Sequence, residues 1–190
     1  MWIIADALKW GSVVPVGRIR GGRALFEDLT FAEIEARIAA SHADVRALYA
    51  YWQSKRHGDA PPRRLDIDPV EVKQCLGAIT IVDVVPDPRR FVYRLVGTWD
   101  VAGRGYDPTG KSVAEAFFGG TAEETLSCYE YAVRTMGPFC YRDPYLAPDG
   151  KTEQDDIIYL PLSEDGATVT SILVFGHSFH PTRRDAGSAF

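Results

Sequence analysis

AITIVDVVPDPRRFVYRLVGT, residues 78–98, is the stretch that decides the fold. Its first part, 78–85, is rich in β-branched residues and favours an extended chain. After a Pro-Asp-Pro turn sequence, Phe91, Tyr93 and Leu95 alternate with other residues and so fall on one face of a second strand. The stretch therefore predicts a β-hairpin.

Helices and strands come in blocks after this hairpin. Turn-forming residues fill 97–112, and a short helical piece is predicted near 113–118. The spacing Thr121-x-x-Glu124 matches a capping box and predicts a helix that ends near Met136, before a Gly-Pro pair. Three further strands are predicted, at 139–147, 154–162 and 168–177. Because strands and helices do not alternate singly, we predict an α+β domain with one antiparallel sheet covered on one face by helices.

A helical region is predicted before the hairpin. Thr30-x-x-Glu33 matches a second capping box, and apolar residues then recur at three-four spacing over Phe31–Trp52. Ser41 interrupts this stripe, and Ser41-x-x-Asp44 could restart a second helix. Two interpretations of the stripe stay open: it packs on its own domain, or it pairs with a second copy as in a two-stranded coiled coil.

The remaining segments divide the chain. A proline-rich connector leads to Asp68-Pro69, which predicts a short helix that runs to about Leu76. Both chain ends are rich in glycine or lack a regular period, and we expect them to be flexible. The predicted division is an extension over 1–29, a helical region over 30–76, the main domain over 77–178 and a tail over 179–190.

Composition bounds the partners and the compartment. Lysine and arginine number 21 against 26 aspartates and glutamates, a net charge of -5, which argues against nucleic-acid binding. The three cysteines form no CxxC pair, as is typical of proteins in a reducing compartment. No apolar run is long enough to span a bilayer, and the first residues do not fit a signal peptide. We expect a cytoplasmic protein.

Five short strings, taken together, resemble a known family. They are Leu48-Tyr-Ala-Tyr-Trp52, Pro62-Arg-Arg-Leu-Asp-Ile-Asp-Pro69, Phe91-Val-Tyr-Arg-Leu-Val-Gly-Thr98, Thr109-Gly110 and Leu160-Pro-Leu162. Their order and spacing over about 45–176 are similar to those of a bacterial PAS-like group. The residues that carry this motif include Trp52, Arg64, Asp66, Asp68, Gly97 and Gly110.

The resemblance implies a five-stranded antiparallel sheet with a small pocket between sheet and helices. Such a domain senses a small molecule or pairs with a partner and has no catalytic turnover. No output domain fits in the rest of this sequence, so the resemblance implies a separate signalling protein as the output. A homodimer through the Phe31–Trp52 helix would fit this role.

The pocket walls can be named from the pattern. Aromatic side chains at inward or helix-sheet positions, with Thr98 to orient a guest, are Tyr93, Trp99, Phe117, Tyr129 and Phe175. Arg94 or Arg64 could hold a carboxylate or phosphate of a ligand. The alternative is an ion pair of these arginines with Asp66 or Asp68 that ties the connector to the sheet.

Cofactor motifs of the family do not match this sequence. None of the four histidines falls between Gly97 and Met136, where the resemblance would place a haem ligand. The cysteines lack the Asn-Cys-Arg surroundings of a covalent flavin adduct. His177 and His180 are three residues apart but have no neighbouring acids or cysteines. We therefore expect no haem, no covalent flavin adduct and no metal, and the cofactor stays unknown.

A second hypothesis, from a different class, is a small α+β enzyme with a cone-shaped, pocketed fold. It would act on a hydrophobic small molecule by acid–base chemistry, with aspartate and tyrosine groups as acid and base. Strand order separates the two hypotheses, because a hairpin joined to the last strand is the PAS arrangement.

Overall fold

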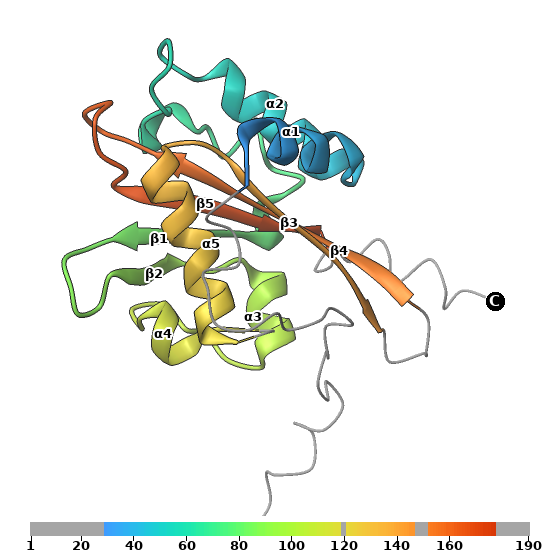
Figure 1. Ribbon diagram of the computed structural model, residues 1–190. Coiled ribbons are helices and arrows are strands. Elements are labelled where there is room, and N and C mark those ends of the chain that lie inside the picture. Colours follow the sequence, from blue (N-terminus) through green and yellow to red (C-terminus); the bar gives the residue numbers. More distant parts are fainter. Residues whose placement is uncertain (1–28, 119–120, 147–151, 178–190) are drawn as a thin grey trace, which may run out of the picture.

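The computed structural model describes residues 29–118, 121–146 and 152–177 (Figure 1). Its α-helices are α1 Phe31–Ala40, α2 Ala43–Ser54, α3 Thr98–Arg104, α4 Val113–Ala116 and α5 Ala122–Thr135. Two 3₁₀ helices are η2 Arg64–Asp66 and η3 Leu76–Ala78. The strands are β1 Ile79–Val84, β2 Phe91–Leu95, β3 Phe139–Leu146, β4 Thr152–Leu162 and β5 Ser171–Gly176. The predicted tail and nearly all of the predicted extension lie outside the described residues.

The strands form one five-stranded antiparallel sheet in the order β2-β1-β5-β4-β3. The predicted hairpin is β1 with β2, and β1 also pairs with β5 through Thr80 and Val174. The last strand thus joins the first hairpin at the centre of the sheet. This order confirms the predicted five-stranded antiparallel sheet of an α+β fold and does not match the curled sheet of the enzyme hypothesis. The prediction of helices on one face only is corrected, because the N-terminal helices cover the second face.

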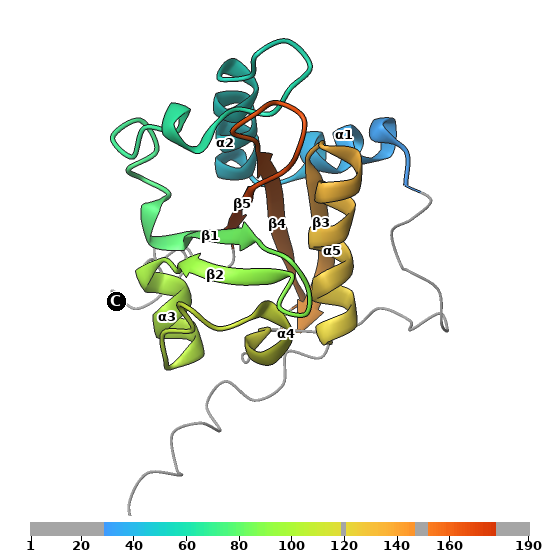
Figure 2. The ribbon, with the colours of Figure 1, turned by 90° about the vertical axis from the view of Figure 1, so that its left-hand side faces the viewer.

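The sheet carries helices on both faces, and strand alternation defines them. Tyr159 of β4 points to α5, where its ring centroid lies 5.0 Å from that of Tyr129. Asp156, on the alternate side of β4, accepts a hydrogen bond of 2.7 Å from the backbone N–H of His42 between α1 and α2. We call the face toward α3, α4 and α5 the inner face and the face toward α1 and α2 the outer face. Both views show α1 and α2 away from α3 and α4 (Figures 1 and 2).

The apolar stripe of the N-terminal helices packs on the outer face of its own sheet. Phe31, at the start of the stripe, is 57% exposed, but its other apolar members are at most 3% exposed: Ile34, Ile38, Val45, Leu48 and Trp52. The Trp52 Nε1–H also donates a hydrogen bond of 2.9 Å to the carbonyl of Pro161 in β4. This contact resolves the alternative left open by the sequence, because a stripe buried within one chain is not available to a second copy.

Of the two possibilities for Phe31–Trp52, one helix or a restart after Ser41, the structure shows the restart, because α1 ends at Ala40 and α2 begins at Ala43. Ser41 adopts an extended conformation, and its hydroxyl donates a hydrogen bond of 2.6 Å to the carbonyl of Ile38. Serine side chains compete in this way with the helical hydrogen bonds of the backbone. A second helix does restart, but its N-cap is His42, whose Nδ1 accepts from the Asp44 backbone N–H.

The predicted helix from Asp68-Pro69 to Leu76 is wrong. The Asp68 side chain does accept from the backbone N–H of Val70, as a cap would. The hydrogen bonds that follow, however, join residues three apart, as between the Cys75 N–H and the Val72 carbonyl. The segment is a run of turns that ends in η3, because no i to i−4 ladder forms.

Two glycines let the hairpin and α3 approach closely. A Cβ atom on Gly97 would lie 2.3 Å from the carbonyl oxygen of Gly77, and one on Gly77 would lie 2.3 Å from the Trp99 ring. A Cβ atom at either position would clash with these neighbours, so both positions require glycine. Gly97 therefore belongs to the packing of η3 against α3.

None of the helices in the described ranges is long and apolar enough to cross a bilayer.

We predict that Trp52→Ala lowers the free energy of unfolding by about 3–5 kcal/mol, because it leaves a cavity on the outer face and removes the bond to Pro161. Urea unfolding followed by far-UV circular dichroism measures this change. Phe31→Ala is the matched control, since Phe31 lies on the same helical pair but is 57% exposed, and its cost should stay within about 0.5 kcal/mol. Equal costs for the two variants would contradict the packing of the stripe on the sheet.

Candidate functional site

Aromatic side chains fill the layer between the inner face and the helices. Tyr129 of α5 lies 5.2 Å from Phe91 and 5.0 Å from Tyr159, measured between ring centroids. Burial raises the pKa of Tyr129 and of Tyr159 well above the usual value for a phenol. Both are therefore neutral hydroxyls near pH 7, suited to hydrogen bonding and not to acting as a base.

One ion pair lies within this layer. The Nε of Arg104 is 2.6 Å from the Oδ1 of Asp100 one turn earlier in α3, and these side chains are only 7% and 9% exposed. Asp100 also accepts a hydrogen bond of 3.1 Å from the hydroxyl of Thr80 in β1. Burial by itself would lower the pKa of Arg104, but the hydrogen bond to Asp100 raises it, so the guanidinium stays charged.

Arg104 connects three elements that surround the inner layer. Its Nη1 donates a hydrogen bond of 2.8 Å to the carbonyl of Ala116 at the end of α4, and its Nη2 lies 3.4 Å from the hydroxyl of Tyr93 in β2. The Phe118 ring lies 4.9 Å from the guanidinium carbon and is itself 41% exposed. Phe118 thus covers Arg104 on the side that faces solvent.

The structure separates the predicted pocket residues. Tyr93 and Tyr129 lie in the inner layer, and Trp99 is partly buried against Gly77. Phe175 is buried on the outer face, because it is the register partner of Ile158 next to Tyr159. Exposed positions are occupied by Arg94, Thr98 and Phe117.

The structure gives the arginine and aspartate motif other ion pairs than the predicted one. Arg94 pairs with Asp83 on the neighbouring strand, at 3.0 Å on the surface. It does not tie the connector to the sheet through Asp66 or Asp68. Asp66 instead pairs with Arg63 and with His57, and these two groups hold the pKa of its carboxyl well below the usual range.

The other motif residues have structural roles in the connector and the loops. The backbone N–H of Arg64 donates to Glu164, and that of Asp68 donates to the hydroxyl of Tyr51. Gly110 has a φ of 85°, a conformation that favours glycine, and its N–H donates to the carbonyl of Tyr93. This bond holds the loop before α4 along β2.

Sequence reasoning missed Thr80, Asp100 and Arg104 as a group. A signal was present, because an acid and an arginine at i and i+4 face the same side of a helix. Their spacing says nothing of burial, since exposed pairs of this kind are common on helix surfaces. Only the packing of α3 against β1 makes the pair an interior feature.

Among the residues that the structure describes, one group could hold a metal ion. It consists of His42, Asp44 and His177, whose ligand atoms all lie within 4.8 Å of one another. The sequence analysis had considered His177 with His180 and expected no metal there, and His180 lies outside the described residues. The group is on the outer face, away from Arg104.

A comparison with protein-family models agrees with the fold that the strand order indicates. A family model described as PAS domain matches residues 40–176. A search of curated protein sequences finds no match.

Solved structures of similar fold include the PAS domain of a protein from Colwellia psychrerythraea, with 16% identity, a TM-score of 0.41 and coverage of 58% of this chain and 96% of that chain. For the PAS domain of an HTR-like protein from Haloarcula marismortui the identity is 18%, the TM-score 0.34 and the coverage 57% and 89%. For the dark structure of the blue-light photoreceptor Aureochrome1 LOV the identity is 14%, the TM-score 0.40 and the coverage 70% of this chain and 99% of that chain. Likenesses at this level say nothing about what this chain binds.

We predict that Arg104→Met lowers the free energy of unfolding by about 3–5 kcal/mol, because it leaves the buried Asp100 carboxylate without its counter-charge. The double variant Asp100→Leu/Arg104→Met should recover most of this loss, since well-packed apolar residues often replace a buried ion pair without cost. Urea unfolding of both variants checks the difference. A double variant as unstable as the single one would show that the charges do not act as a pair.

Arg94→Ala should change the free energy of unfolding by at most about 1 kcal/mol, because the Arg94 side chain is 50% exposed and its ion pair is screened by water. Thermal unfolding at low and at high salt measures this effect and its screening. Loss of folding in this variant would contradict the surface position of the pair.

Proposed function

The chain belongs to the PAS domain family, and we propose that it is a sensory module that binds a small molecule at the inner face of its sheet. The ligand would combine an apolar body with an acidic or other hydrogen-bond-accepting group. Arg104 would hold that group, and Tyr93 and Tyr129 would contact the apolar body. The observation that carries this proposal is the buried guanidinium, which is shared by α3, β2 and α4.

The free-energy cost of burying the charge of Arg104 supports a role for this residue beyond stability. Removing two charges from water costs several kcal/mol per ion, and apolar residues of similar size often stabilise a core better. The guanidinium presents its donors in a planar fork that matches a carboxylate. Its partners Asp100 and Ala116 come from the two short helices that cover the site. A hydrogen-bond acceptor of the ligand would take over the Nη1 donor that now binds the Ala116 carbonyl, and Asp100 would keep its ion pair with the guanidinium.

Signalling would follow from a shift between two packings of the helices on the sheet. A ligand shifts such an equilibrium only as far as it binds one packing better than the other. Asp100 links α3 to Thr80 in β1, and β1 pairs with β5, so a movement of α3 has a direct path to the centre of the sheet. The N-terminal helices pack on the other face of this sheet, against β3 and β4, and would carry the change to an output protein.

The output would be a separate signalling protein or a second copy of the chain. Either partner would contact the exposed sides of α1 and α2, because their apolar stripe is buried against the sheet.

Free, buried cysteines at Cys75, Cys128 and Cys140 favour a reducing compartment, which supports a cytoplasmic location. Burial raises the pKa of the Cys128 thiol to about 12, so it is not a nucleophile near pH 7.

Native mass spectrometry of the full chain tests the ligand. The protein is incubated with a small-molecule extract of its host cells, and the mass of the folded chain is compared before and after. We expect a bound small molecule on the wild type and on Arg94→Met, and none on Asp100→Leu/Arg104→Met. The Arg94 variant is the matched control, because it removes a guanidinium from the surface of the same domain.

Circular dichroism first establishes that the double variant is folded. Retention of the same small molecule by the folded double variant would exclude Arg104 as its ligand contact. A wild type that takes up nothing from the extract would contradict the sensory proposal itself.

A further inference from the structure

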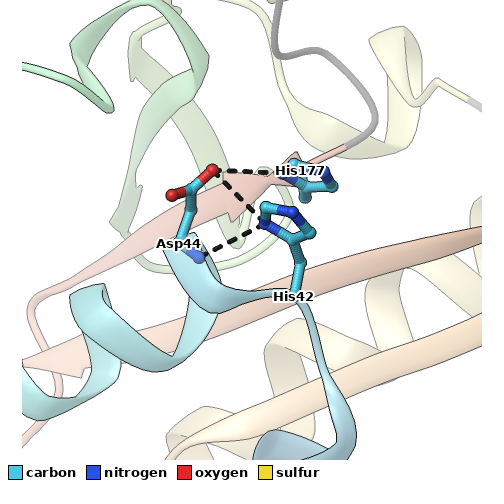
Figure 3. A group of neighbouring side chains, drawn as sticks. All are labelled: His42, Asp44 and His177. Atoms are coloured by element: carbon cyan, nitrogen blue, oxygen red, sulfur yellow. Dashed lines mark hydrogen bonds and ion pairs between the residues drawn. The ribbon is translucent and has the colours of Figure 1, made fainter. Parts of the chain in front are cut away.

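His42, Asp44 and His177 bring two imidazoles and one carboxylate together on the outer face (Figure 3). His42 and Asp44 come from the start of α2, and His177 follows the end of β5. The Oδ2 atom of Asp44 lies 3.3 Å from the Nδ1 of His42 and 3.4 Å from the Nδ1 of His177. Both rings therefore direct the same kind of nitrogen at one carboxylate oxygen.

The Nδ1 of His42 already has two neighbours that a bound ion would affect. It accepts a hydrogen bond from the backbone N–H of Asp44, and it lies 3.3 Å from the Asp44 carboxylate. The Asp44 N–H is a weak rival for a cation, because its distance of 3.3 Å is long for a hydrogen bond.

The two histidine rings stack with their centroids 3.4 Å apart and their planes 12° from parallel. An ion bound by both Nδ1 atoms must lie close to the plane of each ring, so one ring has to turn out of this stack when the ion binds. His42 is the ring that can turn, because its side chain is 44% exposed whereas His177 is buried.

The distances between the ligand atoms suit a tetrahedral ion. Bonds of about 2.0–2.1 Å at tetrahedral angles place neighbouring ligand atoms about 3.3–3.4 Å apart, which is the range expected for zinc with His and Asp ligands. The two distances to Asp44 Oδ2 agree with this range. With three protein ligands, a fourth position would be open, and His42 at 44% side-chain exposure leaves it within reach of solvent.

Supporting contacts hold the backbone of His42 and the ring of His177 in place. The buried Asp156 accepts a hydrogen bond of 2.7 Å from the His42 backbone N–H and one of 2.9 Å from the Nε of Arg142. His177 is itself only 5% exposed, so its ring is held by packing.

We propose that His42, Asp44 and His177 form a binding site for a divalent transition metal ion of the zinc type. This site is independent of the proposed small-molecule function at Arg104. A bound ion would join the start of α2 to the end of β5, and so would hold the N-terminal helices on the outer face. Metal binding would thereby stabilise the attachment of the helices that the sensory proposal uses for output.

Isothermal titration of the untagged full chain with Zn²⁺ tests the site, with thermal unfolding as a second measurement. We expect one ion per chain and a higher melting temperature in the presence of zinc. His42→Ser keeps an N-cap for α2 and removes the imidazole, and His177→Phe keeps a ring in the buried space. Each should weaken zinc binding by about 100-fold or more and abolish the zinc-dependent rise in melting temperature.

His57→Ala is the matched control, because it removes a histidine that pairs with Asp66 outside this group. It should bind zinc as the wild type does. Circular dichroism shows which variants fold, and the exposed His42 position keeps the test decisive if His177→Phe does not. A wild type without zinc binding would overturn the proposal, as would a folded His42→Ser variant that binds zinc as tightly as the wild type.

Discussion

Burial on both faces of one sheet is the constraint on which the rest of the structure depends. In β4, Ile158 and Leu160 face the N-terminal helices, whereas Tyr159 faces α5, and all three are buried. Each central strand therefore needs a helical layer on either side. Removing either layer would expose a continuous apolar surface, so the N-terminal helices are part of the domain core and not an appendage to it.

Each layer is also joined to the sheet by polar groups. On the inner face, Asp100 and Arg104 connect α3 to Thr80 and Tyr93, and on the outer face Asp156 holds the junction between α1 and α2. Polar contacts add direction to packing, because a hydrogen bond is lost when its partners move by an ångström or two. A change in either layer therefore has a defined route to the sheet, where β5 lies between β1 and β4, which suits a domain of the PAS family.

Local patterns in the sequence predicted the elements with their own internal signals. Both capping boxes, at Thr30 and Thr121, begin helices as expected, and the five strands occupy the predicted stretches within a few residues. The failures came where a local pattern had two outcomes of similar energy. Ser41 could continue a helix or end it, and the turns after Pro69 lacked the hydrogen bonds of a helix. In both places tertiary packing selected the outcome.

The sequence by itself determined the fold class, the hairpin and the family, because these follow from periodicity and from short motifs that act over a few residues. It could not determine which face of the sheet a buried aromatic occupies. Alternation with period two divides the residues of a strand into two sets, but only the packed helices decide which layer each set faces. Phe175 therefore lies on the outer face of the sheet, whereas Tyr93 and Tyr129 lie in the inner layer. The Asp100–Arg104 pair and the His42, Asp44 and His177 group were equally beyond it. Burial and contacts between residues far apart in the chain exist only after the helices have packed on the sheet.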